Sequence, residues 1–236
     1  MKSWKTLLAV AAFLNASYAL ALGGLADLSV YDRTEGRQLA VHWHEGRAYV
    51  AGKPGNEYQV ALRSRSGEEV LAVVSVDGIN VITGRSADPG QSGYVLAPRG
   101  ALEIRGWRKS LAQTAAFYFT SLPDSYAART GRPDDVGVIG VALFRKRQDL
   151  PAASISKSDA RAAADQGLGT GHGRHEDSPA QYVSFERATS APAEVVTLYY
   201  DSYRNLLARG VIREAVPVAP FPLPRPFPGF VPDPRG

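Results

Sequence analysis

The stretch from Val70 to Ile82, with the sequence VLAVVSVDGINVI, decides the fold class. Apolar residues fill nearly every position from Val70 to Val76, which is typical of a β-strand buried on both faces. Asp77-Gly78 then separates this run from a second apolar run. A type I′ turn needs positive φ at both central residues, so an Asp-Gly pair between apolar runs is a strong hairpin signal. The sequence therefore predicts a β-hairpin at the centre of the protein.

Further short strands are predicted on both sides of this hairpin. Alternating apolar residues mark segments around Tyr58–Leu62, Tyr94–Leu96, Leu102–Ile104 and Phe117–Phe119, and a last long apolar strand covers Val136–Phe144. Strands and helices do not alternate here, and no internal repeat is visible. The fold class expected is mainly β, an antiparallel β-sandwich or jelly-roll-like core with one or two short C-terminal helices.

The first 21 residues have the three parts of a secretory signal peptide. Lys2 and Lys5 precede the apolar run Leu7–Leu14, and Ala19-Leu20-Ala21 provides a small-x-small cleavage site. The apolar run is far shorter than the roughly 20 residues that span a bilayer. We expect cleavage after Ala21, export to the periplasm or the extracellular space, and no transmembrane span after cleavage.

The remainder divides by composition. We expect a lead-in segment at 22–46 with one strand, the sandwich core at 47–147, a C-terminal extension at 148–215 and a Pro-rich, disordered tail at 216–236. The extension is predicted to contain a short helix ending at Gln166, a Gly-rich loop at 167–173, and strands at 181–187 and 194–200. A second helix is predicted to be capped by Asp201 and to end at Gly210.

Composition excludes several classes of function. Apolar residues make up 44% of the 236 residues and charged residues 21%, as in folded proteins. The absence of cysteine excludes disulfides, thiolate metal sites and Cys nucleophiles. Cleavage would leave 25 basic residues against 23 acidic ones, and this small excess is no electrostatic footprint for nucleic acid. A nucleic-acid partner is therefore not expected.

Several sequence segments resemble a group of uncharacterised exported bacterial proteins. They are the Asp77-Gly78 hairpin, QSGY at 91–94, GWRKS at 106–110, SYAARTGRP at 125–133, VGVIGV at 136–141 and GTGHG at 169–173. The resemblance covers most of the chain after the signal peptide. It implies export and a shared fold, and it implies no activity and no site residues.

The four histidines suggest a metal site. They form two pairs, His42-x-His44 and His172-x-x-His175, and Glu176 follows the second pair. Residues i and i+2 of a strand share a face, and three or four N/O ligands suit Zn²⁺ or Cu²⁺. The alternative is that these are surface or loop histidines without a metal, since no recognised metal signature is present.

A second candidate site binds an anion or a glycan. Trp107, Arg108 and Lys109 lie in one predicted loop, and Arg129 and Arg132 lie in another. If the two loops are neighbours, these side chains can stack on a sugar or hold an anionic group. The alternative for Trp107 is that it plugs one end of the core with its indole N–H on a carbonyl oxygen.

No catalytic constellation is visible. The Gly-rich segment from Gly167 lacks the preceding strand and following helix of a nucleotide fingerprint, and no nucleophile elbow occurs. We therefore expect an exported non-catalytic binding or structural protein, whose partner is an envelope polymer, a glycan or a protein. The alternative is a metal-binding protein or metal-dependent enzyme that uses His42 and His44 with His172 and His175. A third possibility is a structural envelope protein, and the sequence leaves the oligomeric state open.

Overall fold

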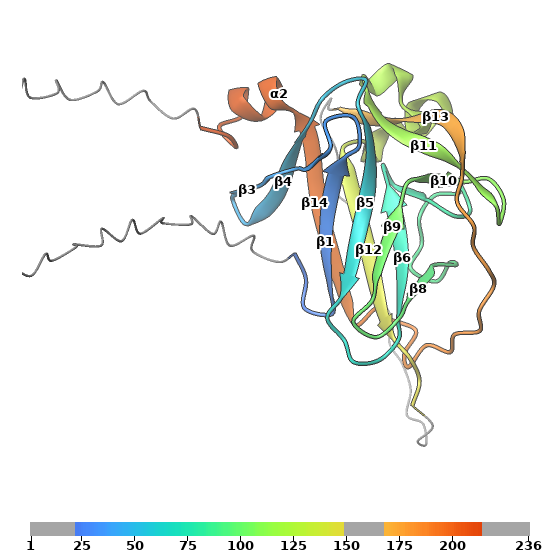
Figure 1. Cartoon of the computed structure of the whole chain (residues 1–236). Helices are drawn as coiled ribbons and strands as arrows, with labels where there is room; N and C mark the ends of the chain where they lie inside the picture. The colour runs from blue at the N-terminus through green and yellow to red at the C-terminus, as the bar shows by residue number, and fades with distance from the viewer. Residues whose placement is uncertain (1–21, 149–167, 214–236) are drawn as a thin grey trace, which may run out of the picture.

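The computed structural model describes residues 22–148 and 168–213, and these residues form two β-sheets that pack face to face (Figure 1). The fold class predicted from the sequence, a mainly β sandwich, is confirmed. One sheet, sheet A, has the strand order β10-β11-β5-β1-β2, with β13 paired to β11 and β9 paired to β5. The other, sheet B, has the order β3-β4-β14-β12-β6-β7, with β8 paired to β6. Every strand pair is antiparallel except β4 and β14, which are parallel.

The strands of sheet A are β1 (Ala26–Asp32), β2 (Arg37–Gln38), β5 (Glu57–Ser64), β9 (Ala101–Ile104), β10 (Gly106–Arg108), β11 (Gln113–Thr120) and β13 (Gly169–Asp177). The strands of sheet B are β3 (Val41–His44), β4 (Arg47–Gly52), β6 (Val70–Val76), β7 (Ile79–Asn80), β8 (Tyr94–Leu96), β12 (Val138–Arg145) and β14 (Glu194–Ser202). The helical elements are η1 (Leu122–Asp124), α1 (Tyr126–Arg129), η2 (Pro133–Asp135) and α2 (Tyr203–Ala208). None of the helices in the described ranges is long and apolar enough to cross a membrane.

The central hairpin forms as its sequence predicts. Asp77 and Gly78, between β6 and β7, both have positive φ, at 51° and 68°. All but one of the residues of β6 are buried. Val74 and its same-face neighbours belong to the main core, whereas Leu71 and Val73 pack on the outer face of sheet B against Phe144. A strand that is covered on both faces needs this continuous apolar run.

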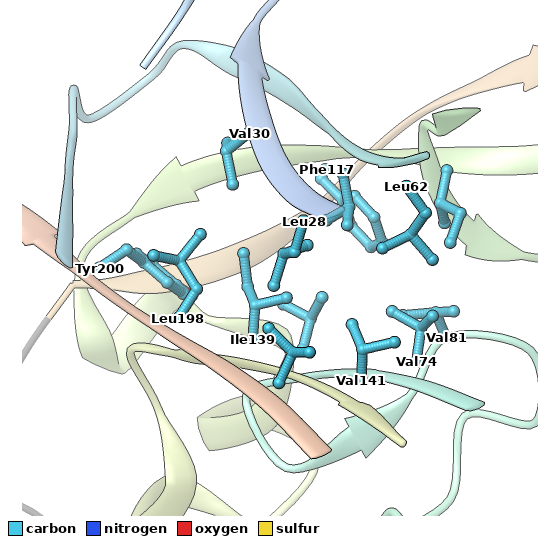
Figure 2. Close-up of a cluster of buried hydrophobic side chains, with 14 of the residues drawn as sticks. Leu28, Val30, Leu62, Val74, Val81, Phe117, Ile139, Val141, Leu198 and Tyr200 are labelled. Carbon is cyan, nitrogen blue, oxygen red and sulfur yellow. The ribbon is translucent and has the colours of Figure 1, made fainter. Parts of the chain in front are cut away.

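The main hydrophobic core lies between the two sheets (Figure 2). Leu28 and Leu62 of sheet A are almost fully buried there, as are Ile139, Val141 and Leu198 of sheet B. Burying one such aliphatic side chain contributes about 1.5–3 kcal/mol relative to leaving it exposed. Because the chain has no cysteine, no disulfide joins the sheets, and this core supplies the apolar contact between them.

The segment 22–46 contributes more to the sandwich than the single predicted strand. It forms three strands, and the first of them, β1, pairs with β5 along its whole length from Ala26↔Ser64 to Asp32↔Tyr58. Burial alternates strictly along β1. Its buried positions include the small residue Ala26 and a polar one, Asp32, so the apolar alternation that marks a strand is weak in the sequence.

The prediction of a loop at 167–173 is wrong, because Gly169–Asp177 is strand β13. The glycines here serve close packing. A Cβ on Gly171 would lie 2.1 Å from Tyr118 Cζ, and one on Gly169 would lie 2.5 Å from Ser125 Cβ. Glycine in a strand interior often marks such a close approach of a neighbouring group.

The prediction of a strand at 181–187 is also wrong. Within this segment only an isolated bridge between Arg187 and Lys146 is present. Phe185 packs on the outer face of sheet B, whereas Tyr182 is 89% exposed and Val183 is 55% exposed, so the alternation does not mark one buried face. The Arg187 guanidinium lies over the Phe144 ring, 4.2 Å from its centroid.

The C-terminal part of the described chain agrees with the sequence. Strand β14 covers the predicted strand, and α2 follows it and stops before Gly210, which has a φ of 71°. The N-cap is Ser202, one residue after the predicted Asp201, and its side chain accepts a hydrogen bond from Asn205 N. The predicted signal peptide, the helix ending at Gln166 and the Pro-rich tail lie outside the described residues.

Candidate functional site

A β-bulge in β13 brings His172 and His175 to the same face. Ala115 is paired with His175 and Phe117 with His172, so β13 has one residue more than β11 between these two pairs. Residues i and i+3 of a regular strand point to opposite faces, and the extra residue of a bulge cancels this difference. The two imidazole rings lie with their centroids 6.1 Å apart.

Helix α1 and strand β10 flank the two histidines. The Ser125 side chain caps α1 by accepting a hydrogen bond from Ala128 N at 3.1 Å. This helix places the Tyr126 ring 5.5 Å from the His172 ring and 4.9 Å from the Trp107 ring. The two segments predicted as loops are instead strand β10, at Gly106–Arg108, and helix α1, at Tyr126–Arg129. The contact between Tyr126 and Trp107 makes them neighbours, as the candidate anion site requires.

Trp107 is buried at one end of the core, which is the alternative that the sequence left open to an exposed, ligand-stacking Trp107. It is only 4% exposed, and its Nε1–H donates to the carbonyl oxygen of Gly171 at 3.2 Å. Its ring packs edge-on against Phe117, with the centroids 5.1 Å apart. Trp107 thus fills the end of the core, and its ring is not open to a ligand.

Three basic side chains lie near enough to His172 for their charges to affect its ionisation. Partial burial lowers the pKa of His172, and the nearby charges of Lys109, His175 and Arg129 lower it further. The side chains of Lys109 and Arg129 are exposed, and neither forms an ion pair within the described ranges. We call Lys109, Arg129, His172 and His175 the basic cluster.

The two other predicted anion-binding arginines are occupied by contacts within the protein. Arg108 donates to the Tyr94 hydroxyl at 3.2 Å from both Nε and Nη2, and to the Ser178 hydroxyl at 3.1 Å. Arg132 donates to the carbonyl oxygen of Gly84 at 3.1 Å and to the Thr130 hydroxyl at 2.9 Å. These arginines tie loops together, and a ligand would have to replace those bonds to use them.

The four histidines do not gather at one place. His42 and His44 lie on β3 in sheet B, whereas His172 and His175 lie on β13 in sheet A, on opposite sides of the sandwich (Figure 1). Glu176 is bound by Arg33, whose Nη1 and Nη2 donate to its two carboxylate oxygens at 3.0 and 2.8 Å. Within 22–148 and 168–213, no group of three or more His, Cys, Asp or Glu side chains is arranged to hold a metal ion.

A buried polar network links the two sheets behind the basic cluster. The Asp77 carboxylate accepts hydrogen bonds from Gly137 N at 2.9 Å, Thr170 N at 2.7 Å and the Tyr200 hydroxyl at 2.5 Å. The Thr170 hydroxyl bonds to the hydroxyls of Tyr200 at 2.6 Å and Tyr58 at 2.5 Å. Every member is buried, so the network fixes β13 against both sheets.

Burial controls ionisation in this network. Desolvation raises the pKa of Asp77 to about 6, against its hydrogen bonds, which lower it. Burial and the nearby Asp77 charge raise the pKa values of Tyr58 and Tyr200 well above the ordinary value. Sequence reasoning assigned Asp77 to its turn alone, because Thr170 and Tyr200 lie 93 and 123 residues away along the chain.

The basic cluster combines members of both predicted sites, since Lys109 and Arg129 come from the candidate anion site and His172 and His175 from the candidate metal site. Lys109 and Arg129 are exposed and lie near enough to His172 for their charges to act on it. Comparison with family models, curated proteins and solved structures finds no match to this chain.

Proposed function

We propose that this chain is an exported, non-catalytic binding protein that takes an anionic ligand at the basic cluster. The observation that supports the proposal is that Lys109, at the end of β10, and Arg129, on α1, lie near enough to His172 of β13 for their charges to act on it, beside His175 of the same strand. No carboxylate of the described chain pairs with either Lys109 or Arg129. Export is supported by the signal-peptide pattern of residues 1–21.

The chemistry of the basic cluster favours carboxylate, phosphate or sulfate groups on a polymer or glycan. Two permanent cations on separate segments give a ligand two points of attachment, and charge-assisted hydrogen bonds are the strong ones. Imidazoles add donors whose charge depends on pH. The cluster is held by the strand β13 and the capped helix α1, so it needs little ordering on binding. An anionic polymer of the cell envelope is the partner that this chemistry fits.

The experiment compares an anionic with a neutral oligosaccharide on the exported protein. Fluorescently labelled oligogalacturonate and maltooligosaccharide of equal length are titrated at low and physiological ionic strength. We expect oligogalacturonate to bind in a salt-dependent way and maltooligosaccharide not to bind. Lys109→Gln/Arg129→Gln should weaken binding about tenfold or more.

The matched control removes two positive charges elsewhere. Arg63 on β5 and Arg204 on α2 are exposed, and neither makes an ion pair in the described chain. Arg63→Gln/Arg204→Gln should leave binding within about twofold of the unsubstituted protein, apart from a small net-charge effect. Equal losses in the two double variants, or equal binding of the neutral oligosaccharide, would overturn the proposal.

A further inference from the structure

The residue that follows the predicted cleavage site is built into the sandwich. Leu22 is 6% exposed and belongs to the main core. Its carbonyl oxygen accepts a hydrogen bond from Leu28 N at 3.1 Å. The chain turns tightly at Gly23, where φ is 112° and a Cβ would lie 2.2 Å from the Ala26 oxygen. Leu22 is therefore held by its side chain, its carbonyl oxygen and the turn behind it.

Two carboxylates hold the backbone nitrogens of this segment. Glu194 on β14 accepts from Gly24 N and Leu25 N, each at 2.6 Å. Asp27 on β1 accepts from Leu22 N at 2.8 Å. The cation nearest to Asp27 by strand register is Arg63 on β5, and no ion pair joins them. The Asp27 carboxylate thus faces the Leu22 nitrogen without a cation from any described side chain.

We propose that the bond between Ala21 and Leu22 is the processing site, and that the new α-ammonium of Leu22 forms an ion pair with Asp27 in the mature protein. Hydrolysis of this amide adds water across the bond. Ala21 leaves as a carboxylate, and the Leu22 nitrogen becomes an amine, protonated below an ordinary pKa of about 7.7–8.0. The neutral peptide N–H of Leu22 beside Asp27 is thereby replaced by a positively charged α-ammonium that has three N–H donors.

The contacts of Leu22 also distinguish the products of cleavage at neighbouring bonds. Cleavage one residue later would remove the buried Leu22 side chain and the nitrogen that Asp27 binds, which should raise the unfolding equilibrium constant about tenfold or more. Cleavage several residues earlier would leave an uncharged peptide nitrogen beside Asp27. The proposal rests on the export part of the proposed function and is independent of anion binding.

The first test identifies the mature N-terminus. The full chain is exported from a Gram-negative host, and the intact mass of the purified protein is measured. We expect the mass of residues 22–236. Retention of the leader, or a first residue other than Leu22, would overturn the proposal.

The second test measures the ion pair by a double-mutant cycle. Residues 22–236 and 17–236 are each prepared with Asp27 and with Asp27→Asn, and unfolding by urea is followed. In 22–236 the substitution should raise the unfolding constant about five- to tenfold more than in 17–236, where the α-ammonium lies elsewhere. Equal effects in the two chains would refute the ion pair.

Glu194→Gln is the matched control for this cycle. Glu194 binds the nitrogens of Gly24 and Leu25, which remain peptide nitrogens in both chains. Its substitution should therefore have the same effect in 22–236 and 17–236. Binding of oligogalacturonate reports on the basic cluster alone, so failure of the anion proposal and failure of the processing proposal give different results.

Discussion

The substitution Tyr200→Phe removes the Tyr200 hydroxyl and tests how much the buried polar network contributes to the stability of the fold. The hydroxyl donates to Asp77 Oδ1 at 2.5 Å and bonds to the Thr170 hydroxyl at 2.6 Å. The aromatic ring remains in place, so its contacts with Phe119 and Tyr58 are retained. A hydrogen bond to a charged group contributes about 1.5–3 kcal/mol and a neutral one about 1 kcal/mol. We expect the free energy of unfolding at neutral pH to fall by about 2–4 kcal/mol.

The loss of unfolding free energy caused by Tyr200→Phe should be larger at neutral pH than at acidic pH. The pKa of Asp77 in the folded protein is raised from 3.8 to about 6, so the folded state binds this proton more tightly than the unfolded state. The stability from this group is fully present below pH 3.8 and is lost as the pH rises through 6, a change of about 3 kcal/mol. The Tyr200 hydrogen bond lowers the pKa of Asp77. Its removal raises that pKa further, so the variant should lose more stability at neutral pH than at acidic pH.

The assay is urea unfolding followed by circular dichroism at pH values below and above 6. The difference between variant and unsubstituted protein is used at each pH, since other carboxylates then cancel. Tyr199→Phe is the control, because Tyr199 lies next in the same strand and its hydroxyl makes no hydrogen bond within the described chain. It should cost less than about 0.5 kcal/mol. The reasoning would be refuted if Tyr200→Phe lowered the free energy of unfolding no more than Tyr199→Phe does. It would also be refuted if the loss caused by Tyr200→Phe did not grow as the pH rises.

Three further outcomes follow from the geometry. Gly106→Ala should destabilise the protein by about 2 kcal/mol or more in thermal melts, because its Cβ would lie 2.0 Å from the backbone oxygen of Ala115, whereas Gly67→Ala has open space and should be nearly neutral. Because the pKa of His172 is lowered, this imidazole should gain its charge only at acidic pH. Oligogalacturonate titrations should therefore show tighter binding as the pH falls below the ordinary histidine pKa of about 6.5, and His172→Gln should remove part of that gain. Binding that does not change with pH would contradict this expectation. In Zn²⁺ titrations, the two histidine pairs should contribute independently to any binding, since they lie on different sheets. Ala substitution of the pair on β3 should therefore leave unchanged whatever Zn²⁺ binding the pair on β13 supports, and the reverse should also hold. Abolition of all binding by either double substitution would instead indicate one shared ion.

The sequence supplied the fold where local chemistry was unambiguous. The run from Val70 to Val76 predicted a strand buried on both faces, and Asp77-Gly78 predicted the turn with positive φ. Both depend on neighbouring residues alone. The glycines of 167–173 predicted a loop, and the segment from Gly169 is instead a strand. Glycine is required both in loops and where a strand packs closely against a neighbour, and the sequence alone does not distinguish the two.

The candidate site was predictable only in its parts. Lys109, Arg129, His172 and His175 were all identified as candidate ligands, but in two separate sites. The bulge in β13 and the packing of α1 against it brought them together. A bulge changes which face a side chain occupies, and no short motif in this segment announces it.

By itself, the sequence determined the strand-rich class, the hairpin at Asp77-Gly78 and the lack of any disulfide. These follow from apolar periodicity, turn stereochemistry and residue type, which are local properties. Only the tertiary structure decided that Trp107 is buried, that Arg108 and Arg132 are occupied, and that Asp77 meets Tyr200 across 123 residues. Such contacts depend on strand order and register, and these are fixed by the packing of whole sheets rather than by neighbours in the chain.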